Sequence, residues 1–338
     1  MHPMYQLTNK PLKTELHHWW PRTLSEHWRA PDQMVSVIRP NGDVLRARPG
    51  AFGGITNAHH IKKGYPWDST FEHIFNKPDS DINDFVSWIF TLEASRAESN
   101  HPMIERILAQ PLPQERQQQM ARIVASLLAR SPRVRYAIKL GAEYFREQFG
   151  LTDPTADKNL IAGNQRGLYD AYRKLMENSG RWAILFSDSM EFIAGDGFLH
   201  NFPASVDGLN SGKKLVLPIL PTTAIIYMFP MGYPTNPKLV TLRVDNDEVE
   251  QLNDLVQIYS RDLLFFRSEQ PVISDAFRCG QHCEFQYDQH EWLDGILDDL
   301  SQYNLWGKDG TPGMGSNRPY SESIAGNRIL DQLARRIE

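Results

Sequence analysis

The spacing of apolar residues changes once along the chain, near Gly180, and this change constrains the fold more than any other feature of the sequence. Before it, apolar residues recur at helical spacing, as in the i, i+3, i+4, i+7 stripe of residues 85–92. After it, residues 181–243 hold short apolar runs separated by turn residues, with no helix-length segment between them. This order predicts an α+β fold, in which a helical bundle packs on a mostly antiparallel β-sheet.

Helical periodicity covers most of residues 80–179. It predicts helices over Gln114–Arg130, about 133–149 and about 158–177. Ser131-Pro132 separates the first two, because proline disfavours helical conformation in the residue before it. Further predicted elements are a hairpin at 34–46 with an Asn41-Gly42 turn, a helix at 246–262, a short strand at 263–268, and helices at 287–302 and 321–337.

Composition and charge narrow the class of protein. Of the 338 residues, 41% are hydrophobic and 23% are charged, which favours a folded chain over a disordered one. The net charge of −5 gives no overall basic excess for sequence-independent DNA binding. With two cysteines, no apolar leader and no run long enough to span a bilayer, we expect a cytoplasmic protein without disulfides or a membrane segment.

Length favours more than one domain. The predicted segments are an N-terminal segment with the hairpin (1–79), a helical region (80–180) and a β-sheet region with C-terminal helices (181–338). These three segments can also form one integrated domain.

Two short motifs resemble ligand-binding sequences but depart from them in spacing. Residues 208–213 read GLNSGK, one residue short of a phosphate-binding loop and followed by a strand, so we expect a hairpin turn and no nucleotide cofactor. Cys279, His282, Cys283 and His290 have zinc-ligating side chains in an unusual order, and we predict no stoichiometric zinc there.

Three polar or aromatic clusters have structural explanations. The helix dipole accounts for an acidic run at a helix start, and we expect no metal there. The basic stretch that begins at His59-His60 and continues to Lys62-Lys63 is typical of a solvated loop. Large tryptophan side chains near the N-terminus are expected to fasten this segment to the body of the protein. The acidic run is Asp79, Asp81 and Asp84, and the tryptophans are Trp19, Trp20 and Trp28.

Several segments, in order, resemble a widespread and mostly bacterial family that is catalogued as domain of unknown function 4238. The opening His18–Trp28, HWWPRTLSEHW, is similar to the family's H-x-x-P-[RQ]-x-x-L-x-x-[FW]. The other similar segments are TLEAS at 91–95, LLARSPRVR at 127–135, EFIAGD at 191–196, LVLPILP at 215–221 and VEQLN at 249–253. The family has no established activity, so the resemblance implies candidate residues and not a reaction.

The polar residues in these segments are the candidate site. His18, Glu93 and Asp196 are of the types that bind a divalent metal, here magnesium or manganese, or act as general acid and base. Arg130 and Asn253 are candidates for binding substrate, because arginine recognises phosphate and asparagine orients polar groups. We expect His18, Glu93 and Asp196 to converge on one cleft with Arg130 on its wall.

Each candidate also has a structural interpretation. Glu93 borders the apolar stripe of its helix, so we expect a partly buried carboxylate paired with Arg130, and this pair can simply lock two helices. Asp196 can cap a turn, and Asn253 can be an interior amide.

The sequence leaves two function classes open. The first is a metal-dependent hydrolase that acts on a phosphodiester, as nucleases do, with nucleic acid as a candidate partner. The second is a non-catalytic binding or regulatory protein, which would contact a protein partner through its aromatic N-terminus and its glycine-rich loop at 307–317.

Overall fold

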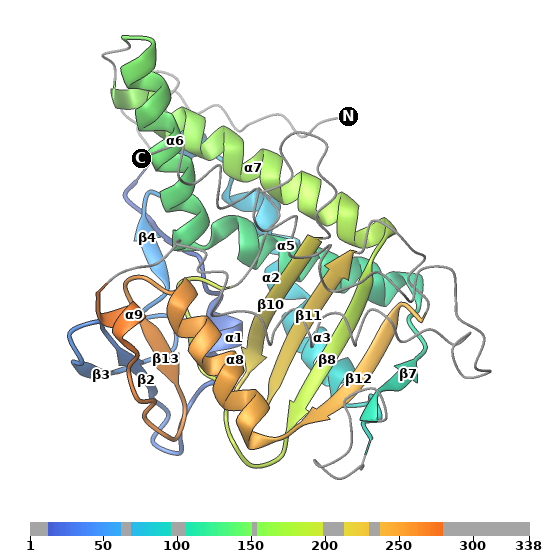
Figure 1. Ribbon diagram of the computed structural model, residues 1–338. Coiled ribbons are helices and arrows are strands. Elements are labelled where there is room, and N and C mark those ends of the chain that lie inside the picture. The colour runs from blue at the N-terminus through green and yellow to red at the C-terminus, as the bar shows by residue number, and fades with distance from the viewer. Residues whose placement is uncertain are drawn as a thin grey trace, which may run out of the picture. The chain divides into compact units, whose positions relative to one another are not determined.

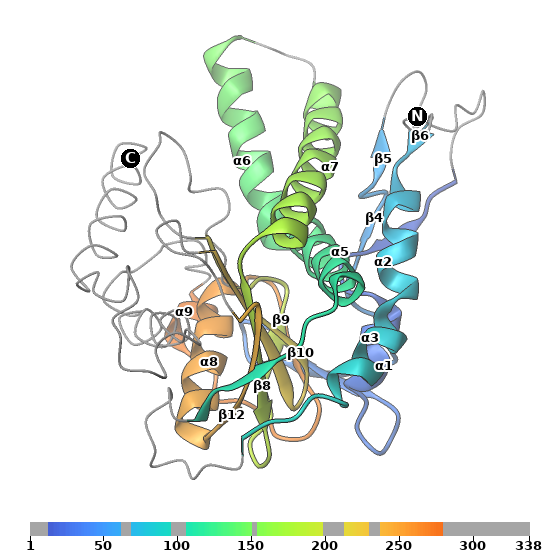
Figure 2. The same ribbon diagram turned by 90° about the vertical axis from the view of Figure 1, so that its right-hand side faces the viewer.

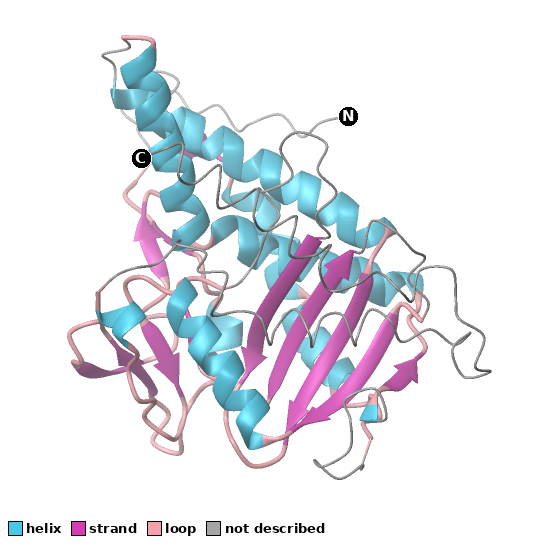
Figure 3. Cartoon of the chain, in the orientation of Figure 1, coloured by secondary structure: helices cyan, strands magenta, loops and turns pink. Residues whose placement is uncertain are grey.

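The computed structural model describes residues 13–61, 69–95, 106–150, 154–198, 213–229 and 237–279, and the statements below concern this part of the chain (Figure 1). It contains both helices and sheets, which confirms the predicted α+β class (Figure 3). The chain divides into two compact units, each assembled from three stretches of sequence. Unit 1 comprises residues 1–37, 44–87 and 114–177, and unit 2 comprises residues 38–43, 88–113 and 178–338. The segments predicted from the sequence were instead consecutive along the chain.

Unit 1 holds the helices that the periodicity predicts. α5 (Gln114–Arg130) and α6 (Pro132–Gln148) follow each other, and the Oγ of Ser131 accepts the backbone N–H of Val134 at 3.3 Å where α6 begins. The apolar stripe of α5 is buried, which explains why this segment forms a helix. The other helices are α1 (Arg22–His27), the 3-10 helix η1 (Glu72–Phe75), α2 (Asn76–Ser80), α3 (Ile82–Ile89) and α7 (Pro154–Asn178).

The strands of unit 1 are short. β1 (Leu16–His18) pairs antiparallel with β4 (Gly54–Thr56), and β5 (His60–Ile61) pairs antiparallel with β6 (Ser69–Thr70). The predicted hairpin is confirmed as β2 (Val35–Ile38) and β3 (Val44–Ala47). Gly42 in its turn has a φ of +89°, a conformation that glycine adopts without strain.

The N-terminal tryptophans are part of the core of unit 1, as predicted. Trp20 and Trp28 are 1% and 0% exposed, with ring centroids 6.4 Å apart. The backbone N–H of Trp19 donates to the carbonyl oxygen of Gly53 at 2.7 Å. Gly53 has a φ of +74°, and a Cβ added there would lie 2.9 Å from the Cβ of Trp20. The approach of the N-terminal segment to this loop therefore requires glycine.

Unit 2 is built on a five-stranded sheet in the order β10-β11-β8-β12-β7. Four of its strands fall in residues 181–243 or at their edge, which confirms the prediction of at least three strands in one sheet. The sheet is mixed, because β12 pairs parallel with β8 while the other pairs are antiparallel. The strands are β7 (Leu108–Gln110), β8 (Arg181–Ser187), β10 (Lys213–Leu220), β11 (Thr223–Phe229) and β12 (Leu239–Val244).

Helix α8 (Asn246–Tyr259) covers one face of this sheet (Figure 2). It begins with a capping box, in which Asp245 accepts the backbone N–H of Glu248 and Glu248 accepts that of Asp245. Its apolar face, which includes Val249 and Leu252, packs in one cluster with residues from β8, β10, β11 and β12. β13 (Leu264–Phe266) and β9 (Ala194–Gly195) pair antiparallel in the same unit, and the short helix α9 (Asp275–Arg278) ends the described chain.

Several sequence predictions lie outside the described residues. They are the helices at 287–302 and 321–337, nearly all of the 208–213 turn, and all of the Cys279–His290 cluster except Cys279, which is exposed. No helix within the described ranges combines the length and apolar character needed to cross a membrane.

Candidate metal centre

The two predicted site residues of unit 1 have local partners. The Nε2 of His18 lies 3.1 Å from the carbonyl oxygen of Gly50. Arg130 forms a bidentate ion pair with Asp79, in which Nη2 lies 2.6 Å from Oδ1 and Nη1 lies 3.0 Å from Oδ2. The predicted pair between Arg130 and Glu93 is therefore wrong. The guanidinium is already saturated by an aspartate of the run at 79–84.

In unit 2, Glu93 is exposed, which corrects the prediction of a partly buried carboxylate. The backbone oxygen of Glu93 accepts hydrogen bonds from Gln110 Nε2 at 2.9 Å and from Thr241 Oγ1 at 2.5 Å. Asn253 bridges two backbone groups as an interior amide, accepting from Ile193 N at 2.9 Å and donating to Glu191 O at 3.0 Å.

Asp196 holds a loop together. It is 1% exposed, and its two carboxylate oxygens accept the backbone N–H groups of Arg261 and Asp262 at 2.7 and 2.8 Å. Burial raises the pKa of Asp196 to about 7, although the donated hydrogen bonds act in the opposite direction. Asp196 thus does what the structural interpretation expects. The convergence of His18, Glu93 and Asp196 on one cleft stays a prediction.

The acidic run has a structural use as well. Arg116 and Arg122 of α5 form ion pairs with Asp84 and Asp81, in the way that Arg130 does with Asp79. These aspartates therefore pair with arginines of α5.

A different cluster in unit 1 brings together three histidines and two glutamates that come from distant parts of the sequence. They are Glu15, His17, His59, His60 and Glu72. β1 carries His17 opposite Ile55 of β4. At the end of this ladder, the backbone N–H of Glu15 donates to Oδ1 of Asn57, and the backbone N–H of Asn57 donates to the carbonyl oxygen of Glu15. Asn57 has a φ of +55°, so the chain turns sharply there and returns His59 and His60 toward β1.

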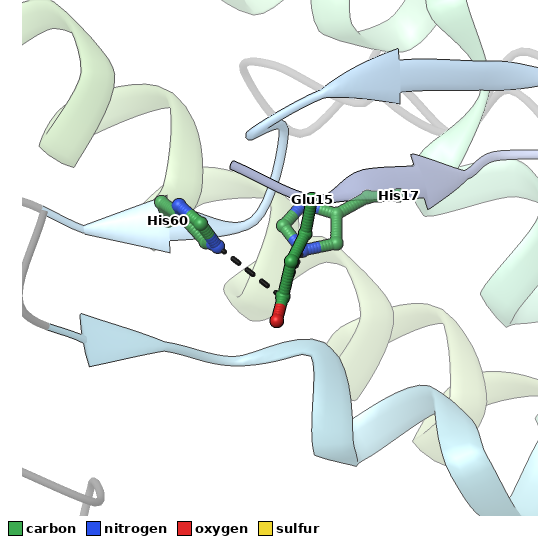
Figure 4. A group of neighbouring side chains, drawn as sticks. All are labelled: Glu15, His17 and His60. Carbon is green, nitrogen blue, oxygen red and sulfur yellow. Dashed lines mark hydrogen bonds and ion pairs between the residues drawn. The ribbon is translucent and has the colours of Figure 1, made fainter. Parts of the chain in front are cut away.

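The carboxylate of Glu15 contacts both His17 and His60 (Figure 4). Its Oε2 is 3.4 Å from the Nε2 of His17 and 3.5 Å from the Nε2 of His60. One ligand atom of each residue lies within 4.8 Å of the other two. Zinc binds nitrogen at about 2.0–2.1 Å, so two ligands of a tetrahedral site lie about 3.3–3.4 Å apart. The distances from the glutamate oxygen to the two nitrogens are therefore close to the ligand–ligand distance in a tetrahedral zinc site.

Burial differs between the members of this group. His17 and His60 are 3% and 2% exposed, while the side chain of Glu15 is 54% exposed. The Nδ1 of His60 is buried and has no hydrogen-bond partner in the described part of the chain. Burial lowers the pKa of His60, which favours the neutral imidazole that ligates metals. The group thus joins two buried neutral donors to one carboxylate at the surface.

His59 and Glu72 form a hydrogen-bonded dyad beside this group. The Nδ1 of His59 bonds to Glu72, the backbone N–H of His59 donates to the Nδ1 of His17 at 2.9 Å, and the two rings stack with centroids 4.8 Å apart. Burial lowers the pKa of His59 to about 4. Burial alone would raise the pKa of Glu72, but the hydrogen bond and charge of His59 and the charge of Arg130 lower it. A neutral ring and an ionised carboxylate therefore hold His17 in place.

Sequence reasoning missed this cluster. It selected His18, the neighbour of His17, and it treated His59-His60 as a solvated loop, which is wrong because both rings are buried. The available signal was the repetition of a histidine pair, at 17–18 and again at 59–60.

No family model, no curated protein and no solved structure matches the chain. The resemblance to the family of unknown function stays a prediction, and the chemistry of the site has to be argued from its donor atoms.

Proposed function

We propose that the protein is a metal-dependent hydrolase whose ion is held by Glu15, His17 and His60. The observation that carries this proposal is the spacing of the three donors, with Glu15 Oε2 3.4 Å from one imidazole nitrogen and 3.5 Å from the other. Two imidazoles and one carboxylate form a set that zinc uses in hydrolases, with a fourth position left for water.

A network of hydrogen bonds without metal explains these distances less well. Hydrogen bonds from nitrogen to a carboxylate are usually about 2.7–2.9 Å long. The two contacts of Glu15 are clearly longer, and His60 keeps one buried nitrogen unpaired, which costs free energy in a closed structural cluster. A metal ion at the centre would make the observed spacing favourable.

The donor set also favours particular metals. Imidazole suits zinc, iron, copper and nickel, whereas magnesium prefers oxygen ligands. The donor set therefore suits zinc or another transition metal better than the magnesium considered from the sequence. Manganese is intermediate between zinc and magnesium in this respect. Because the backbone N–H of His59 donates to Nδ1 of His17, the neutral ring carries its proton on Nε2. For Nε2 to bind a metal, the ring would have to carry this proton on Nδ1 instead, so metal binding would replace the hydrogen bond from His59.

The residues divide the work of hydrolysis between them. His17 and His60 would hold the ion through buried donors, and Glu15 would hold it through a carboxylate that water can reach. The ring of His59, which is hydrogen-bonded to Glu72, stacks on the ring of His17 and limits its rotation. A divalent ion held here would supply Lewis acidity and lower the pKa of a coordinated water. We propose a phosphodiester as the substrate, with nucleic acid as the partner class.

The experiment is a phosphodiesterase and nuclease assay of the full chain with zinc, manganese or magnesium, comparing wild type with His60→Gln and Glu15→Gln. His18→Gln is the matched control, since His18 is adjacent in sequence and its ring Nε2 lies 3.1 Å from the carbonyl oxygen of Gly50. We expect zinc or manganese to support hydrolysis that both ligand variants lose and the control keeps. Metal binding without hydrolysis of any phosphodiester would favour the alternative of a non-catalytic binding protein.

A further inference from the structure

Arg135 differs from the arginines of α5 in having no acidic partner in the described part of the chain. Its Nη1 donates to the carbonyl oxygen of Ala58 at 3.0 Å and to the Oε1 of Gln165 at 3.3 Å. Its Nε and Nη2 make no hydrogen bond, and no carboxylate pairs with it, in the described part of the chain. By contrast, each of the α5 arginines at 116, 122 and 130 has its own aspartate.

The lack of a counter-charge for Arg135 is unfavourable in free energy. Burial lowers the pKa of Arg135, because water is partly removed from a cation that no anion replaces. Arg135 also lies in the first turn of α6, where no acidic residue is present. The partial positive charge of a helix N-terminus disfavours a cation and attracts an anion there. Among the described residues, no carboxylate offsets this arrangement, whereas a bound anion would.

The guanidinium is also held in place. Gln165 is 1% exposed, and its Nε2 donates to the carbonyl oxygen of Ala129 at 3.3 Å, so its Oε1 is fixed toward Arg135. The other partner, Ala58, precedes His59 directly and His60 by two residues. Arg135 is therefore bound to the same short segment that carries His60 of the proposed metal centre and His59 of the neighbouring dyad.

We propose that Arg135 binds the anionic group of the substrate beside the metal centre, and that this group is the phosphoryl group of a phosphodiester. The inference rests on the proposed function for the reaction, but the anion site can be tested separately. Arginine suits this role because its planar guanidinium pairs with two oxygens of a phosphate at once. It replaces Arg130, whose guanidinium is already paired with Asp79, as the candidate for binding phosphate.

The test is a titration of the full chain with inorganic phosphate, followed by phosphorus NMR, with and without zinc. Wild type is compared with Arg135→Gln and Arg135→Lys. Lys139→Gln is the matched control, because it removes one positive charge from the same helix one turn later, where Lys139 pairs with Glu143 at 3.4 Å. For any variant that hydrolyses a phosphodiester, KM and kcat are also measured, and bound zinc is counted in every variant.

We expect Arg135→Gln to weaken phosphate binding by about 10- to 100-fold, the range for losing a charge-assisted hydrogen bond. The bound zinc should remain unchanged, and the loss should fall mainly on KM. Arg135→Lys should be intermediate, since it keeps the charge but not the paired geometry. It also serves as the test if Arg135→Gln fails to fold.

Equal phosphate affinity in wild type and Arg135→Gln would overturn the inference, even if zinc-dependent hydrolysis is found. Acetate binding that depends on Arg135, in the absence of phosphate binding, would overturn the phosphoryl assignment. Phosphate binding that depends on Arg135 in a protein without bound zinc would support the anion site and contradict the proposed hydrolase instead.

Discussion

Replacing Asp79 with alanine should destabilise the protein strongly, because it leaves the charge of Arg130 buried. The side chain of Arg130 is 0% exposed and that of Asp79 is 31% exposed. Removing one partner of a fully buried ion pair typically costs about 3–5 kcal/mol. In Asp79→Ala, water can reach Arg130 from the side of residue 79. Arg130 also retains its hydrogen bonds to the carbonyl oxygens of Ser126 and His18 and its contact with the ring of Phe75, whose centroid lies 4.6 Å from the guanidinium carbon. We therefore expect a loss of about 2–4 kcal/mol.

The assay is urea unfolding followed by circular dichroism, for Asp79→Ala, Arg130→Met and the double variant. Arg130→Met leaves a carboxylate that water can still reach, so it should cost less than Asp79→Ala. The double variant removes both charges, so it should be more stable than the sum of the two single changes predicts. Glu93→Ala is the control, and its exposed side chain should change stability by less than about 0.5 kcal/mol. An unchanged urea midpoint in Asp79→Ala, or equal losses in Asp79→Ala and Glu93→Ala, would refute the reasoning.

Three further predictions concern other sites. Because the pKa of Asp196 is raised to about 7 in the folded state, its contribution to stability is present below about pH 4 and is lost as the pH rises to about 7. The thermal midpoint of wild type relative to Asp196→Asn should therefore fall over this range, and a constant difference would contradict it. The pKa of His59 is lowered to about 4, so metal-free wild type should lose stability relative to His59→Gln as the pH falls from about 6.5 to 4. A parallel pH dependence of the two proteins would be evidence against a buried neutral ring. Gly53→Ala should cost about 1–3 kcal/mol in urea unfolding because of its positive φ and its contact with Trp20, whereas Gly163→Ala, with open space in α7, should not destabilise the protein.

The fold could be predicted largely from local periodicity. The apolar stripe and the following Ser131-Pro132 gave the limits of α5, and Asn41-Gly42 gave the turn of the β2–β3 hairpin. Local signals could not give the parallel pairing of β12 with β8, because that pairing joins residues 239–244 to residues 182–187, with β9, β10 and β11 between them in the sequence. β7 was missed for a related reason, since three residues carry too little alternation to identify a strand.

The candidate site was harder to predict because it depends on contacts between distant residues. Successive residues of a strand point to opposite faces, so which of His17 and His18 faces the cluster depends on the register of β1 against β4. The sequence shows two histidine pairs but not this register. The charged residues also led to a wrong prediction. Lys62 and Lys63 suggested a solvated loop, but the preceding histidines are buried. The sequence could not identify Asp79 as the partner of Arg130, because the spacing of two residues along the chain does not give the distance between them in the fold.

The central claim is that Glu15, His17 and His60 hold one metal ion. Equilibrium dialysis of the full chain against zinc, followed by elemental analysis, tests it most directly. Because Cys279, His282, Cys283 and His290 are also zinc-ligating side chains, the measurement includes Cys279→Ser beside His60→Gln and the His18→Gln control. We predict one zinc per wild-type chain, which is retained in Cys279→Ser and His18→Gln and lost in His60→Gln. Zinc absent from wild type, or zinc that His60→Gln retains and Cys279→Ser loses, would contradict the account.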